Sequence, residues 1–112
     1  MKKICFICNL GEKTSHLIKT WFDEYLSNNK INSIEVVNAG INSEGNEFHI
    51  KNICESDVLI LAYKGLEDKI RELNPNAELL QLEQLCSYGR SLGKGSTYEG
   101  VFEYLVDKFG EK

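Results

Sequence analysis

Apolar and polar residues follow one another along the chain in blocks that predict alternating strands and helices. Four short apolar runs predict strands near residues 3–8, 34–37, 57–62 and 78–82. Amphipathic segments predict helices over residues 15–28, 65–73 and 97–109. One helical turn is expected over residues 50–55. Strands that alternate with helices are typical of a parallel sheet. We therefore expect a single three-layer α/β/α domain over residues 1–112, with a four-stranded parallel sheet.

The first predicted helix carries an apolar face. We expect that face to pack on the sheet. Its members are Leu17, Ile18, Trp21, Phe22, Tyr25 and Leu26.

The junction between the first strand and the first helix holds the candidate chemistry. Cys8 ends the apolar run, and the segment that follows contains Gly11 and closes with Thr14 and Ser15, which are good N-cap residues. Unpaired amides and the helix dipole favour an anion at such a place. They also stabilise a thiolate, so Cys8 is the candidate nucleophile. Residues 8–15 are thus predicted to form an anion-binding loop.

The composition excludes several classes of protein. The chain has 112 residues and a formal net charge of −4, with no basic stripe that could neutralise nucleic-acid phosphates. No apolar run is long enough to span a bilayer, and the amino terminus lacks a signal-peptide core. We expect a cytoplasmic protein that binds no nucleic acid and has no membrane span.

The four cysteines do not form a metal or redox motif. Cys5 and Cys8 are three apart on a strand and so point to opposite faces. A zinc site would need a second pair of ligands. We expect Cys5, Cys54 and Cys86 to be small core residues. No metal and no cofactor is predicted.

The junction resembles that of the low-molecular-weight protein tyrosine phosphatases and their arsenate-reductase relatives. That family's signature is a cysteine, five residues, an arginine and a serine. Cys8 matches the nucleophile, and Ser15 matches the serine that orients the thiolate. Further along the chain, residues 38–40 resemble the family's Ser-Ala-Gly after strand two, and residues 57–60 resemble its third strand. The resemblance implies a phosphorylated small molecule or a phosphoprotein as substrate. It also implies that the intervening residues bind phosphate: Asn9, Leu10, Gly11, Glu12, Lys13 and Thr14.

Two features of the phosphatase signature are missing. Thr14 stands where the family has the arginine that grips phosphate with a fork of two N–H groups. The family's general acid is an aspartate on the last long loop, whereas residues 87–96 contain no Asp and no Glu. The sequence therefore leaves open whether the chain turns over a phosphate ester.

A second resemblance is to the enzyme IIB components of the lactose/cellobiose sugar phosphotransferase systems. Their pattern of Cys, two residues, Gly, two residues and Thr-Ser matches Cys8, Gly11, Thr14 and Ser15. It implies a phosphoryl carrier that is phosphorylated on Cys8 by a partner protein. A third hypothesis is a non-catalytic descendant that binds an anion or a partner.

Two histidines remain as minor candidates. His16 stands at the start of the first helix, where it is either an acid or a surface residue. His49 is predicted to be a loop residue without a visible partner.

Overall fold

The fold is known from a computed structural model, which describes residues 2–8, 14–40, 47–62, 65, 67–83 and 97–110. Strands and helices alternate along these residues, as predicted. The elements are β1 (Lys2–Cys8), α1 (Thr14–Asn28), β2 (Ile34–Gly40), α2 (Glu47–Glu55), β3 (Val58–Leu61), α3 (Glu67–Leu73), β4 (Glu78–Gln81) and α5 (Thr97–Phe109).

The strands form a parallel sheet in the order β2-β1-β3-β4. This confirms the predicted four-stranded parallel sheet. Strand β3 is buried along its whole length, and so is β1 from Ile4 to Cys8, because both strands lie inside the sheet with helices on either face. Strand β2 is three residues longer than predicted. Its last three residues pair with Phe6, Ile7 and Cys8 of β1, so the segment likened to Ser-Ala-Gly ends the strand instead of following it.

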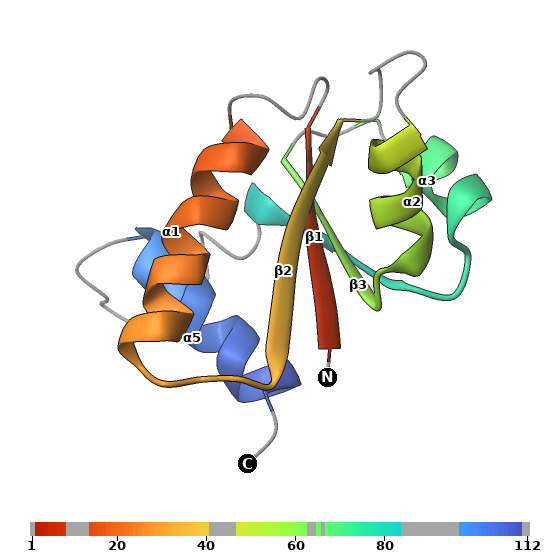
Figure 1. The fold of residues 1–112 in the computed structure, drawn as a ribbon. Coiled ribbons are helices and arrows are strands. Elements are labelled where there is room, and N and C mark those ends of the chain that lie inside the picture. Colours follow the sequence, from red (N-terminus) through yellow and green to blue (C-terminus); the bar gives the residue numbers. More distant parts are fainter. Residues whose placement is uncertain are drawn as a thin grey trace.

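Helices cover both faces of the sheet. Figure 1 shows α1 and α5 on one side, and α2 and α3 on the other. The core is accordingly in two parts. In the α1/α5 layer Phe22 stacks on Phe102 with ring centroids 4.9 Å apart, and Phe6 meets Phe22 edge to face at 6.0 Å. The other layer contains Cys5, Ile7, Ala39, Ile53, Leu59, Leu61 and Ile70.

The apolar face of α1 is narrower than predicted. Ile18, Phe22 and Leu26 are buried at a spacing of four residues, but Leu17 is 50% exposed and Trp21 is 42% exposed. The prediction that all six apolar residues face the sheet was therefore wrong for these two. At about 100° per residue, Leu17 and Trp21 fall on the flank of the stripe that meets the sheet.

Helix α1 ends as the sequence indicates, within the polar residues after Leu26. Lys30 adopts a positive φ of 56°. This turn lets the Ile31 amide reach back to the Leu26 carbonyl at 2.9 Å, and the Lys30 amide reaches the Ser27 carbonyl at 3.2 Å. A left-handed residue with this pair of bonds is a common way to satisfy the last carbonyls of a helix. None of the helices in the described part of the chain is long and apolar enough to cross a membrane.

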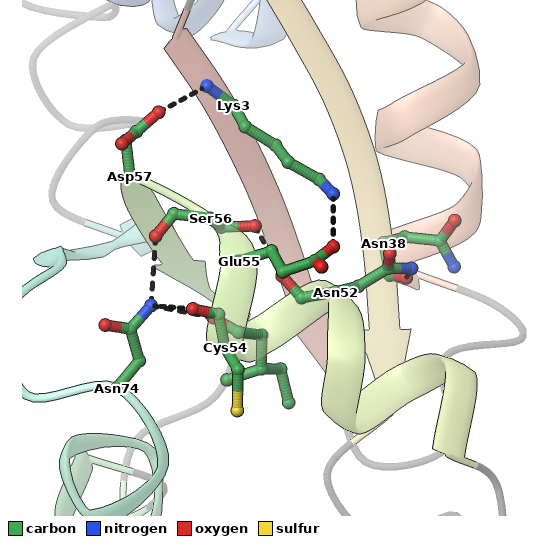
Figure 2. Close-up of polar contacts among 9 residues, drawn as sticks. Lys3, Asn38, Asn52, Cys54, Glu55, Ser56, Asp57 and Asn74 are labelled. Carbon is green, nitrogen blue, oxygen red and sulfur yellow. Dashed lines mark hydrogen bonds and ion pairs between the residues drawn. The ribbon is translucent and has the colours of Figure 1, made fainter.

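Asn74 closes the edge of the sheet at which β3 begins. Figure 2 shows its side-chain amide directed at the end of α2. Nδ2 donates to the carbonyls of Ile53 at 2.8 Å, Cys54 at 3.2 Å and Ser56 at 2.9 Å. Carbonyls in the last turn of a helix have no partner within the helix, so one side chain on α3's carboxyl end supplies the donors that the turn from α2 to β3 needs.

We predict that Asn74→Ala lowers the free energy of unfolding by about 1–3 kcal/mol, because it leaves these carbonyls without their donor. Urea denaturation monitored by circular dichroism would measure the change. The matched control is Asn76→Ala, since Asn76 is exposed two residues away. Equal stability of the two variants would contradict the role given to Asn74.

Candidate functional site

Cys8 lies at the carboxyl end of β1, where the sequence places the candidate nucleophile. It is the last residue of the strand and pairs in register with Gly40 of β2. On the other side, the Ala62 amide donates to the Ile7 carbonyl at 2.9 Å, which extends the contact with β3's end. Ligands of open parallel sheets bind outside the carboxyl ends of the strands. Cys8 therefore occupies the edge at which such a fold places its chemistry.

Ser15 approaches Cys8 from the first turn of α1. The Ser15 Oγ lies 3.0 Å from the Cys8 Sγ, and either atom can be the donor of this hydrogen bond. Ser15 is fully buried and Cys8 is 4% exposed. A thiolate has no proton to donate, so the ionised form of Cys8 would accept its hydrogen bond from the Ser15 hydroxyl. The pair that the sequence predicted as catalytic is thus brought together.

The amino end of α1 faces the same edge of the sheet as Cys8 (Figure 1). The helix begins at Thr14, so Ser15 lies inside the first turn, and its hydroxyl contacts the cysteine. The dipole of a helix of this length favours negative charge at its amino end. Asn9, Leu10, Gly11, Glu12 and Lys13 lie outside the described residues, as does the Thr14 side chain. Their assignment to phosphate binding stays a prediction.

Cys5 lies on the opposite face of β1 from Cys8, and its thiol is expected to be unreactive. It is fully buried in the α2/α3 layer, as predicted. Burial raises its pKa to about 12, an effect that a hydrogen bond with Ser56 only partly offsets. Cys54, by contrast, is exposed, with its Sγ 3.5 Å from the Leu73 carbonyl. The prediction of Cys54 as a core residue was wrong: it lies in the last turn of α2 and contacts the end of α3. Cys86 falls outside the described residues.

His49 is the residue near the site that sequence reasoning missed. It lies in α2, one of the helices that start at the carboxyl edge of the sheet, and is half-buried. Its Nδ1 accepts the Gly40 amide hydrogen at 2.9 Å. The prediction of a loop histidine without a partner was therefore wrong. The segment before it is polar and rich in glycine, which concealed a nine-residue helix where one turn was expected.

Of the remaining candidates, the structure describes His16. His16 is exposed on α1, as one of its two readings predicted, and its carbonyl accepts a hydrogen bond from Thr20. Across the described ranges, no three His, Cys, Asp or Glu side chains are grouped so that they could hold a metal ion.

Comparison of the structure with solved structures finds one type of fold. The solution structure of a low molecular weight protein tyrosine phosphatase from Bacillus subtilis matches with a TM-score of 0.61 and 14% identity, over 94% of this chain and 90% of that chain. Primo-1 matches with a TM-score of 0.58 and 16% identity, over 95% and 92%. The YwlE arginine phosphatase from Geobacillus stearothermophilus matches with a TM-score of 0.57 and 17% identity, over 96% and 87%.

These matches show that the chain has the fold of the low-molecular-weight protein tyrosine phosphatases. The predicted resemblance to that group is thus confirmed at the level of the fold, and it extends over nearly the whole chain. No protein-family model matches the sequence, and no curated protein matches it.

The three described cysteines are expected to react with iodoacetamide in a fixed order near neutral pH. Cys8 should react fastest, because Ser15 and the α1 dipole stabilise its thiolate. Cys54 is exposed and serves as the reference thiol. Cys5 should stay unmodified, because at a pKa of about 12 roughly one thiol in 100,000 is ionised at pH 7. Mass spectrometry of tryptic peptides over time would measure each rate.

Ser15→Ala tests the cause of that order. The variant should slow the alkylation of Cys8 by about tenfold, the effect of losing one hydrogen bond to a charged group. Cys54 in the same sample serves as the internal reference. A parent Cys8 that reacts no faster than Cys54 would contradict its assignment as the nucleophile.

Proposed function

We propose that this chain is a cysteine-dependent phosphate-handling protein in which Cys8 contacts phosphorus and Ser15 orients the thiolate. The observation that supports this most directly is the 3.0 Å contact between the Cys8 Sγ and the Ser15 Oγ. Both side chains are buried at the end of β1 and the start of α1, the junction at which the resemblance to the phosphatases implies the nucleophile. The substrate class we propose is a phosphorylated small molecule or a phosphoprotein, in the cytoplasm, where a thiol stays reduced.

The proposed reaction begins with attack by the Cys8 thiolate on phosphorus. An S–P bond forms as the bond from phosphorus to the ester oxygen breaks, and the leaving oxygen takes a proton from water. Water then attacks phosphorus, the S–P bond breaks, and inorganic phosphate leaves with the Cys8 thiolate restored. In the first step the Ser15 hydroxyl donates to the thiolate, and in the second it donates to the sulfur as negative charge returns to it.

Two side chains that the family resemblance implies for this chemistry are missing at their expected positions in the sequence. Thr14 provides neither the charge nor the paired N–H groups of an arginine, and residues 87–96 contain no carboxylic acid. Each such group typically supplies a factor of about 100 or more in rate. We therefore propose slow turnover of an aryl phosphate and weak binding of free phosphate.

The second candidate function is a phosphoryl carrier. The spacing of Cys8, Gly11, Thr14 and Ser15 favours it, because all four positions match the enzyme IIB pattern. In this reading the S–P bond forms in the same way, but the phosphoryl group comes from a donor protein and passes to an acceptor instead of to water. The two functions share the nucleophile and differ in what removes the phosphoryl group.

The test of the proposed function is protection and turnover at Cys8. Inorganic phosphate or sulfate should slow alkylation of Cys8 and leave the rate at Cys54 unchanged, because only Cys8 lies at the predicted anion loop. The parent should also release phenolate slowly from an aryl phosphate, and Cys8→Ser should abolish that release. Protection without turnover, followed by labelling of Cys8 from a phosphotransferase donor, would favour the carrier. Protection without turnover or labelling would leave an anion-binding descendant, and failure of all three assays would leave a partner-binding one.

We predict that Thr14→Arg raises both phosphate protection of Cys8 and aryl phosphatase activity above those of the parent. An arginine at this position restores two charge-assisted hydrogen bonds to the anion. The gain in activity should stay limited, since the late loop still lacks an acid. Thr14→Lys is the matched control, because it adds the charge without the fork. No gain in either measurement for the arginine variant would show that the loop does not hold an anion.

A further inference from the structure

The backbone amide of Gly40, the last residue of β2, is bound by a side chain, while the residue itself pairs in register with Cys8 of β1. β2 is an edge strand, and Gly40 at its end is buried. A buried amide needs a hydrogen-bond partner, and here the partner is His49 Nδ1 at 2.9 Å. The contact joins two residues that are nine apart in the sequence and lie in different elements. No sequence motif indicates it.

The direction of the bond defines the state of the imidazole ring. A backbone amide can only donate, so Nδ1 of His49 carries no proton when it accepts from Gly40. In the neutral ring the single proton is then on Nε2. The contact therefore uses Nδ1, which is the ring nitrogen nearer to the backbone of His49.

A second hydrogen bond also joins a side chain of α2 to the backbone of β2. Asn52 lies one helical turn after His49 and is buried, and its Nδ2 donates to the Asn38 carbonyl at 3.2 Å. Figure 2 shows the Asn52 side chain extending from α2 toward the backbone of Asn38. His49 and Asn52 thus bind two β2 residues that are themselves two apart. This fixes both the position and the rotation of α2 against the end of β2.

The held strand end adjoins the nucleophile. Gly40 is the register partner of Cys8, and adjacent strands in a sheet lie about 4.8 Å apart. Cys8 itself is 4% exposed, so the rate at which a reagent reaches its sulfur depends on the backbone packed around it. A movement of Gly40 displaces backbone that lies directly beside Cys8.

We propose that His49 is a positioning residue of the Cys8 site, which acts by fixing the Gly40 backbone through Nδ1. Its effect on phosphate binding rests on the proposed function, whereas its effect on access to Cys8 does not. His49 is not proposed to touch the substrate.

The experiment compares two substitutions of similar size that place an oxygen acceptor differently. In His49→Asn the Oδ1 stands where Nδ1 stood, and the bond to Gly40 can be kept. In His49→Gln the Oε1 stands near the place of Nε2, and the bond is lost. Gln is the better helix former, so a purely structural role would favour the Gln variant or treat the two alike. Lys51→Ala, an exposed change on the same helix, is the control.

The readouts are amide hydrogen exchange at Gly40 and alkylation of Cys8 relative to Cys54. His49→Gln should speed both by about tenfold, the factor that corresponds to one hydrogen bond of ordinary strength. His49→Asn and Lys51→Ala should stay within about twofold of the parent. Phosphate should protect Cys8 in the Asn variant and fail to protect it in the Gln variant.

Equal behaviour of the Asn and Gln variants would overturn the proposal, and so would loss of the parent's rates in the Asn variant. If phosphate fails to protect Cys8 in the parent, the proposed function fails. The rates measured without phosphate then still decide the role of His49.

Discussion

The parallel pairing of β1 with the strands on either side is the constraint on which the site depends. It places Cys8 level with Gly40 and one residue beyond the contact between Ile7 and Leu61. A shift of one residue in this register would turn the Cys8 side chain to the opposite face, where Cys5 lies among apolar groups. The 3.0 Å contact with Ser15 would then be impossible. The chemistry of the cysteine is thus set by packing along the whole strand.

Packing on the other side of the contact holds Ser15. Helix α1 is anchored by Ile18, Phe22 and Leu26, which are buried in the α1/α5 layer, and the stack of Phe22 on Phe102 joins the helix to α5. Ser15 lies one turn before the first of these anchors, on the same face of the helix. Its hydroxyl is therefore fixed by core residues that have no chemical role. A rigid support of this kind is what a hydrogen bond to a thiolate requires.

The sequence predicted the parts of this arrangement that depend on local pattern. The apolar run of β1 and the spacing of Cys5 and Cys8 were enough to place Cys5 in the core and Cys8 at the strand end on the opposite face. The contact of Cys8 with Ser15 was expected from the family resemblance alone. The hydrophobic pattern was misleading in α1, which has more apolar residues than the side facing the sheet can bury. Trp21, for example, is 42% exposed. The hydrophobic pattern gave no indication of α2's position, because hydrogen bonds from His49 and Asn52 join this helix to β2. The contact from His49 to Gly40 depends on tertiary placement, and no periodicity in residues 41–49 indicates it.

The missing arginine has a consequence for how a phosphoryl group would be recognised. Under the proposed function, in a chain of net charge −4 without a guanidinium at position 14, the α1 dipole and backbone amides would have to supply the attraction for an anion. A helix terminus contributes about 0.3–1 kcal/mol in an exposed setting and up to about 2 kcal/mol when partly buried, which is less than a forked pair of charged hydrogen bonds supplies. The remaining affinity has to come from the rest of the ligand, through contacts outside the loop. A ligand with a large surface, such as a phosphorylated protein, meets that requirement better than free phosphate does. The same reasoning applies to turnover and to transfer, because both begin with the same bound phosphoryl group.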